Sequence, residues 1–310
     1  MKKSIAFYCC TNGLGHYKRV NEICKYLTDD FTVTVYCTTK QLTKLGPVNN
    51  VTYIIVEDNI NWNLVNQGET QTAVQLYFDW LTKYGPTVNQ YDIVVSDNIV
   101  GLLKFRNNII LCGSFLWKDV FNSKVGENSL SSHDEELLQL HKPILITNKY
   151  VETQSVKQYP NKIQFGFGCD SQRNIFSDIQ HNLVNTSSLN YLPSYSAFID
   201  KLKVESKLAF IDDFSYIDNT RMFARPGVGT ITHCVENNIP LIALFDEADS
   251  QEIIELAQVV EDLRLGFKQN VNEPFDTVKF NTMRSNSSIL YGPTLELQAY
   301  KNIAEYFKQL

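Results

Sequence analysis

Short apolar runs alternate with segments of helical spacing along the first half of the chain. Several runs, such as YDIVVS, are apolar throughout, which is typical of parallel strands buried on both faces. Strand–helix alternation of this kind predicts an α/β fold with a doubly wound parallel sheet. The expected strands span 4–9, 31–38, 51–56, 91–96, 108–112, 143–147 and 163–167, and the expected helices span 15–27 and 70–83.

The pattern breaks around residue 167 and then resumes. Residues 169–194 are polar and weakly periodic, which indicates a domain boundary. Two similar α/β units in tandem predict two Rossmann-like domains facing across a cleft, and ligands bind in such clefts. The second unit is expected to hold strands at 208–211, 220–224 and 240–245, helices at 230–237 and 251–263, and a closing helix at 294–310.

Composition excludes several classes of protein. The chain has 310 residues, of which 44% are hydrophobic and 12% aromatic, and this excludes intrinsic disorder. No apolar run approaches the roughly 18 residues of a membrane span, so none is expected. Seven scattered cysteines without a CxxC pair are typical of free thiols in a reducing compartment, which predicts a cytoplasmic protein without disulfides or zinc.

The net charge of −6 argues against nucleic acid as the main partner, but the charge is unevenly divided. Residues 1–165 hold 16 basic and 15 acidic residues, whereas residues 166–310 hold 12 and 19. The nearly neutral first half does not disfavour nucleic acid, so DNA stays among the alternatives.

The first candidate for chemistry is the segment TNGLGHYKR at 11–19, between the first strand and the first helix. Gly13 and Gly15 permit a tight turn and a close approach of ligand to backbone. His16 lies at the expected carboxyl edge of the sheet, and its pKa suits a general base for a hydroxyl group. The alternative is a plain βα turn in which the histidine makes a local hydrogen bond.

The second candidate is the segment ARPGVGTITH at 224–233, which again links a strand to a helix. Gly227 and Gly229 expose backbone N–H groups, and Thr230 adds a hydroxyl at the helix start. This pattern favours binding of a diphosphate without any lysine, against the alternative of an ordinary capped helix.

The third candidate is the acidic segment DEADSQE at 246–252, at the start of the long helix. Acidic residues are common at helix starts because they suit the helix dipole. Beside an anion-binding loop, however, its carboxylates and amide are also suited to holding sugar hydroxyls.

Together these segments resemble the GT-B glycosyltransferases, and most closely the branch that contains the peptidoglycan N-acetylglucosaminyltransferase and related nucleotide-sugar enzymes with a GxGHxxR loop. Residues 13–19 match that loop in full, and residues 225–266 resemble the donor-binding signature of the family. The resemblance implies domains at 1–167 (acceptor side) and 168–292 (donor side). It also implies that a C-terminal helix at 293–310 crosses back onto the first domain.

Carried over position by position, the resemblance implies His16 and Asp97 as catalytic residues and Arg19 on the acceptor side. Two departures stand out. His233 occupies the place of a glutamate that holds the ribose in the family, and the glycine-rich loop expected early in the second domain is missing. The implied donor-binding residues are Gly13, Gly15, Arg225, Gly227, Gly229, Thr230, His233, Asp249, Gln251 and Glu252.

The resulting hypothesis is inverting, metal-independent transfer of a hexosyl or N-acetylhexosaminyl group from a UDP-sugar to a hydroxyl, with no cofactor. The acceptor is left open among a glycan, a lipid-linked molecule and a small molecule. Three alternatives remain: a UDP-sugar hydrolase of the same fold, a nucleotide-sugar-binding protein without turnover, and a transferase acting on modified DNA bases.

Overall fold

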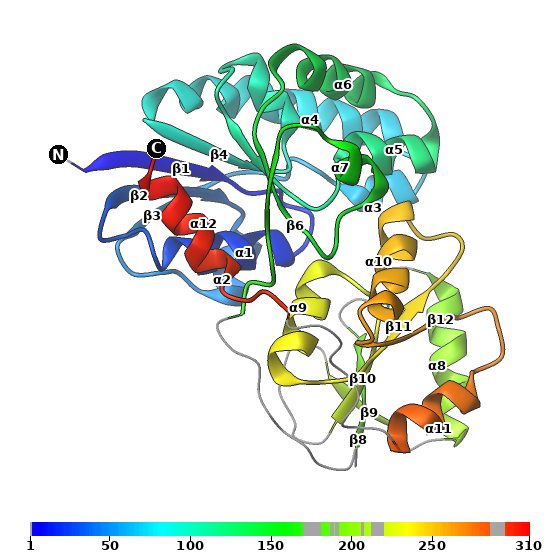
Figure 1. Cartoon of the computed structure of the whole chain (residues 1–310). Helices are drawn as coiled ribbons and strands as arrows, with labels where there is room; N and C mark the ends of the chain where they lie inside the picture. The colour runs from blue at the N-terminus through cyan, green and yellow to red at the C-terminus, as the bar shows by residue number, and fades with distance from the viewer. Residues whose placement is uncertain are drawn as a thin grey trace. The chain divides into compact units, whose positions relative to one another are not determined.

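The chain forms two compact units in the computed structural model. One unit comprises Met1–Phe165 with Ala299–Leu310, and the other comprises Gly166–Gln298. Each is built on a parallel sheet with interleaved helices (Figure 1), so the α/β fold with two Rossmann-like sheets is confirmed. The structure describes residues 2–169, 181–186, 189, 192–205, 208–211, 220–285 and 295–310.

The first unit holds a seven-stranded parallel sheet in the order β3-β2-β1-β4-β5-β6-β7. The strand order changes direction between β1 and β4, and the carboxyl edge at such a point is where open α/β sheets bind ligands. The strands are β1 (Lys3–Tyr8), β2 (Phe31–Cys37), β3 (Val51–Ile55), β4 (Ile93–Asp97), β5 (Ile110–Cys112), β6 (Leu145–Asn148) and β7 (Lys162–Phe165).

Helices cover both faces of this sheet. Apart from α1 and α4, the helices between the strands were not predicted, because most are short and their apolar spacing is weak. The helical segments are α1 (Gly15–Cys24), α2 (Thr39–Leu45), α3 (Trp62–Asn66), α4 (Thr70–Tyr84), η1 (Gly85–Gln90), η2 (Val100–Lys104), α5 (Trp117–Val125), α6 (Ser129–His141), α7 (Gln154–Gln158) and α12 (Ala299–Lys308).

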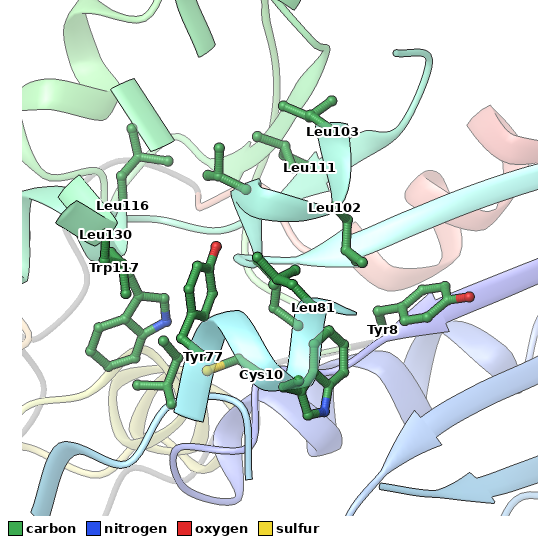
Figure 2. Packing of buried hydrophobic residues seen from close by; sticks show 14 of the residues in the cluster. Tyr8, Cys10, Tyr77, Leu81, Leu102, Leu103, Leu111, Leu116, Trp117 and Leu130 are labelled. Carbon is green, nitrogen blue, oxygen red and sulfur yellow. The ribbon is translucent and has the colours of Figure 1, made fainter. Parts of the chain in front are cut away.

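Alternating side chains of β1 enter two separate cores. Ala6 and Tyr8 belong to the cluster that includes Tyr77 and Trp117, part of which Figure 2 shows. Ile5 and Phe7 belong to a second cluster, on the other face of the sheet. Burial on both faces explains why these strands are apolar throughout.

The C-terminal helix α12 packs on the second of these clusters, within the first unit (Figure 1). The rings of Phe7 and Phe307 meet edge to face with centroids 5.9 Å apart. Burying a phenylalanine side chain contributes about 2 kcal/mol, which holds the end of the chain on this sheet.

The helix α12 begins at Ala299, not at residue 294 as the apolar spacing predicts. The backbone N–H of Phe167 donates to the carbonyl of Glu296 (2.8 Å), and that of Gln298 donates to the carbonyl of Cys169 (2.8 Å). These bonds hold the segment before the helix beside the chain that leaves the first unit. The approach requires a glycine at position 166, because a Cβ there would lie 1.9 Å from the carbonyl oxygen of Glu296.

The second unit holds a five-stranded parallel sheet in the order β12-β11-β10-β8-β9. Its strands are β8 (His181–Asn185), β9 (Leu208–Ile211), β10 (Thr220–Ala224), β11 (Leu241–Phe245) and β12 (Gly266–Asn270). Its helices are α8 (Pro193–Glu205), α9 (Val228–Asn237), α10 (Gln251–Asp262) and α11 (Thr277–Ser285).

Residues 169–194 were expected to be a polar boundary segment, and where the structure describes them they contain the strand β8. β8 lies inside the sheet between β9 and β10, and Leu183 and Val184 are fully buried. The strand was missed because three of its five residues are polar, so it has no apolar run to mark it. The glycine-rich loop missing from the sequence would follow this strand, and Asn185 and Thr186 stand there instead.

Candidate active site

The loop after β1 is held by side chains from two other loops. The Nε2 of Gln41 donates to the carbonyl oxygens of Cys10 and Gly13, both at 2.9 Å. The Nδ2 of Asn59 donates to the carbonyl of Cys9 (2.9 Å), and its Oδ1 accepts from the backbone N–H of Thr11 (2.9 Å). The loop is thus fixed before any ligand arrives.

Gly13 and Gly15 serve this loop in different ways. Gly13 has a φ of +88°, in the left-handed region that favours glycine. A Cβ at Gly15 would have no atom of the described residues within 4 Å. The protein itself therefore does not require a glycine at position 15, and the open space suits the close approach of a ligand.

His16, Arg19 and Asp97 come together at the carboxyl edge of the sheet. The Nδ1 of His16 lies 3.2 Å from Asp97 Oδ1, and the Nη2 of Arg19 donates to the same oxygen. Asp97, the last residue of β4, is fully buried, whereas the side chains of His16 and Arg19 are 13% and 16% exposed. Nδ1 thus faces Asp97, and the imidazole also hydrogen-bonds with the side chain of Cys10.

Charge fixes the protonation of this cluster. Burial alone would raise the pKa of Asp97, but the charges of Arg19 and His16 outweigh it and hold the pKa below its usual value. Burial opposes the charged form of His16, yet Cys10 and Asp97 raise the pKa of His16 to about 10. The ligand-free site therefore holds an ionised aspartate between two cations.

Cys10 and Phe115 adjoin His16 and were not predicted to belong to the site. Cys10 is fully buried in the apolar cluster of Figure 2. Phe115 meets the imidazole edge to face, with centroids 6.1 Å apart. Phe115 comes shortly after β5, so it could have been predicted by considering the residues after every buried strand.

The second candidate segment lies in the other unit, between β10 and α9. Gly227 is the extended residue that caps α9, and the carbonyl of Gly227 accepts from the N–H of Ile231 (2.9 Å). A Cβ at Gly227 or Gly229 would meet no described atom within 4 Å. Thr230 is 6% exposed in the first turn, where backbone N–H groups lack helical partners. This helix start is open and can accept an anion.

Asp249 is buried and joins the two loops of the second unit. Its Oδ1 accepts from the Nε of Arg225 (2.9 Å), and its Oδ2 accepts from the hydroxyl of Tyr195 and from the backbone N–H of Asp246 (2.9 Å). The side chain is 2% exposed. These internal partners make Asp249 a support for the loop and for Arg225. Tyr195, on α8, was not singled out from the sequence.

The remaining residues predicted to bind the donor do not take part in the hydrogen bonds of Asp249. His233 is buried on α9, and the Nδ2 of Asn237 lies 3.2 Å from its Nδ1. Gln251 is exposed at the start of α10, and its Nε2 donates to Glu255 (3.2 Å). Glu252, one residue on, is partly buried, and its charge acts on Arg225.

Among the described residues, no group of three or more His, Cys, Asp and Glu side chains is arranged to hold a metal ion. The helices in the described part of the chain are all too short or too polar to cross a membrane.

The chain resembles solved glycosyltransferase structures along its whole length. A structure of UGT89C1 from Arabidopsis thaliana with UDP-L-rhamnose is 12% identical, with 100% of this chain and 94% of that chain covered and a TM-score of 0.59. The glycotransferase of kitacinnamycin is 10% identical, with 99% of both chains covered and a TM-score of 0.62. The spinosyn forosaminyltransferase SpnP is 13% identical, with coverage of 100% and 95% and a TM-score of 0.56. At these identities the likeness shows the fold, which is GT-B.

No protein-family model matches the sequence, and no curated protein matches it either.

Proposed function

We propose that this protein transfers a sugar from a UDP-sugar to an acceptor hydroxyl, with inversion and without a metal ion. The observation that carries the proposal is the pairing of His16 with the buried Asp97 at the carboxyl edge of the first sheet. Similarity to GT-B structures supports it, and one of these contains UDP-L-rhamnose.

On the acceptor side, the Nε2 of a neutral His16 takes the proton of the acceptor hydroxyl. The freed oxygen forms a bond to the anomeric carbon of the donor while the bond from that carbon to the phosphate oxygen breaks. The proton stays on the imidazole, and Asp97 stabilises the imidazolium through Nδ1. Arg19 keeps Asp97 ionised and so acts through it as a positioning residue.

On the donor side, the start of α9 receives the diphosphate. The backbone N–H groups behind Gly227 and the hydroxyl of Thr230 stabilise the negative charge of the leaving UDP. This arrangement supplies the charge stabilisation that a metal ion would otherwise give. Gln251 and Glu252 bind the sugar hydroxyls, and His233 binds the ribose in place of a glutamate. Arg225 stays paired with Asp249, next to the diphosphate.

The first experiment incubates the protein with a panel of UDP-sugars and hydroxyl acceptors in the presence of EDTA. We expect release of UDP and a glycoside with the anomeric configuration opposite to that of the donor. Release of free sugar at the same rate with and without acceptor would instead identify a hydrolase. Binding of UDP-sugar without any product would identify a protein that binds but does not turn over.

A variant of the helix start tests the donor site. A Cβ at Gly229 would have no described atom beyond its own helix turn within 4 Å, so Gly229→Val should fold and obstruct the diphosphate. We expect the KM for UDP-sugar to rise by about tenfold or more, because a lost charge-assisted hydrogen bond is worth about 1.5–3 kcal/mol. The matched control is Thr39→Val, an exposed residue in the first turn of α2 in the other unit. Equal donor KM in wild type and Gly229→Val would place the diphosphate elsewhere.

A further inference from the structure

Buried polar atoms without a partner gather at the carboxyl edge of the first sheet. Asn98 is 2% exposed, and neither its Oδ1 nor its Nδ2 has a hydrogen-bond partner among the residues that the structure describes. Within the same described set, Arg19 Nε, Asp97 Oδ2 and Thr147 Oγ1 are also buried without a partner. Buried polar atoms are nearly always paired in folded proteins, so a group of five needs a cause.

Strand register relates the positions of Asn98 and Thr147. Asp97 pairs with Cys112 on β5, and Cys112 pairs with Ile146 on β6. One residue further along, Asn98 and Thr147 therefore lie at the same level of the sheet. Both stand at the carboxyl edge: Asn98 directly follows Asp97, and Thr147 lies two strands away, with β5 between.

Close packing locates the Asn98 carboxamide relative to the catalytic pair. A Cβ at Gly113 would lie 3.1 Å from both Cγ and Oδ1 of Asn98, and 3.3 Å from the carbonyl oxygen of Phe115. The ring of Phe115 in turn meets the imidazole of His16. Glycine at position 113 thus makes room for the Asn98 carboxamide.

The local turn does not use this carboxamide. Asn98 has a φ of +67°, in the left-handed region that asparagine tolerates better than most residues. The turn is closed by Ser96, whose Oγ accepts from the N–H of Ile99 (3.1 Å) and donates to the carbonyl of Ile99 (2.7 Å). A glycine would satisfy the same backbone, so the turn does not explain the side chain.

The mixture of free groups indicates the chemistry of the ligand. Arg19 Nε and Asn98 Nδ2 donate, Asp97 Oδ2 and Asn98 Oδ1 accept, and Thr147 Oγ1 does both. An anion would meet donors but also two acceptor oxygens, one of them charged. A flat apolar acceptor would leave all five atoms unpaired. Adjacent hydroxyl groups, each both donor and acceptor, can pair with the whole set.

We propose that the acceptor is a polyol of the saccharide class, with Asn98 binding the hydroxyl next to the one that reacts. The proposal rests on the proposed function, since it takes His16 as the base. Asn98 sets acceptor specificity, and Thr147 extends the same hydroxyl-binding surface.

The test measures binding directly, by NMR or calorimetric titration with methyl glycosides of glucose, galactose, mannose and N-acetylglucosamine. The variant Asn98→Gly keeps the backbone conformation and removes the carboxamide. Its control is Asn50→Gly, an exposed asparagine with a φ of 62° in the same unit. We expect a saccharide to bind wild type and Asn50→Gly equally, and Asn98→Gly at least tenfold more weakly.

Deoxy analogues of whichever saccharide binds then test which hydroxyl group Asn98 contacts. Removing one hydroxyl should weaken binding to wild type by about tenfold but leave binding to Asn98→Gly unchanged, since the contact is already gone. Equal binding by wild type and Asn98→Gly would overturn the proposal, and so would a wild type that binds 4-nitrophenol but none of the saccharides. Thr147→Val supplies a second variant, and thermal melting confirms that each is folded.

Failure of this inference is distinguishable from failure of the proposed function. His16→Ala should still bind the saccharide, because His16 serves the chemical step. If saccharide binding depends on Asn98 while no sugar is transferred, the binding site stands and the transferase proposal falls. If transfer depends on His16 while Asn98→Gly keeps the acceptor KM of wild type, the specificity role of Asn98 falls alone.

Discussion

The first unit contains two histidine–aspartate pairs that share a fold but differ in their surroundings. In one, His16 Nδ1 lies 3.2 Å from Asp97 Oδ1; in the other, His133 Nδ1 lies 3.4 Å from Asp134 Oδ1. Both aspartates are buried, at 0% and 1% exposure. Distance and burial therefore do not distinguish the proposed catalytic pair from the other.

The difference lies in the third partner. Asp97 also binds Arg19, and this cation holds its pKa below the usual value although burial opposes it. Asp134 accepts from the hydroxyl of Tyr77 (3.0 Å), which is neutral, and burial raises its pKa. Asp97 thus remains a strong counter-charge for an imidazolium, whereas Asp134 is a poor one.

Replacing each aspartate by asparagine should give the largest difference in kcat between the two pairs. Asp97→Asn removes the charge that stabilises the imidazolium, so we expect kcat for sugar transfer to fall by about 10²-fold or more. Asp134→Asn should change kcat by less than about threefold. Thermal melting of both variants is the control, because breaking a buried ion pair costs about 3–5 kcal/mol. Equal losses of kcat would show that the comparison is wrong.

The pH dependence of transfer should follow His16. A base must lose its proton before it acts, and the pKa of His16 is raised to about 10. We expect kcat/KM to rise by about tenfold per pH unit from pH 7 to pH 9. In Asp97→Asn the rise should shift to lower pH, because one cause of the raised pKa is gone. A rate in wild type that is flat over this range would exclude His16 as the base.

The free energy of unfolding should also depend on pH through the raised pKa of His16, with a smaller effect than on the rate. A group whose pKa rises on folding binds its proton more tightly in the folded state, so its contribution is present below the unfolded pKa of about 6.5. That contribution is lost as the pH rises through about 10. The difference in free energy of unfolding between wild type and His16→Gln should therefore shrink from pH 6 to pH 10, as measured by urea denaturation. A difference that grows with pH would contradict the raised pKa.

Sequence patterns predicted all seven strands of the first sheet but missed β8 and β12 in the second. The inner strands of the first sheet are apolar because helices cover both faces, so each one is visible as an apolar run. β8 is just as central in its own sheet, but His181, Asn182 and Asn185 make it read as a loop.

The sequence predicted those residues of the candidate site that come directly after the carboxyl ends of strands. Asp97 ends β4 and His16 stands in the first turn of α1, which follows β1, so topology brings the two together. The roles proposed for Asn98 and Thr147 could not be predicted from the sequence. They rest on buried side-chain atoms without hydrogen-bond partners, which only the packed structure reveals. Asp249 was expected to bind ligand, but the structure gives its carboxylate internal partners that no spacing rule reveals.

The central claim is that His16 is the base in glycosyl transfer, and the pair His16→Ala and His133→Ala tests it most directly. The measurement is the rate of UDP release with saturating UDP-sugar and acceptor, with donor affinity measured in parallel. We predict that His16→Ala loses about 10²- to 10⁴-fold in rate and keeps its donor affinity, while His133→Ala stays within about twofold of wild type. A His16→Ala variant that turns over at the wild-type rate would contradict the account.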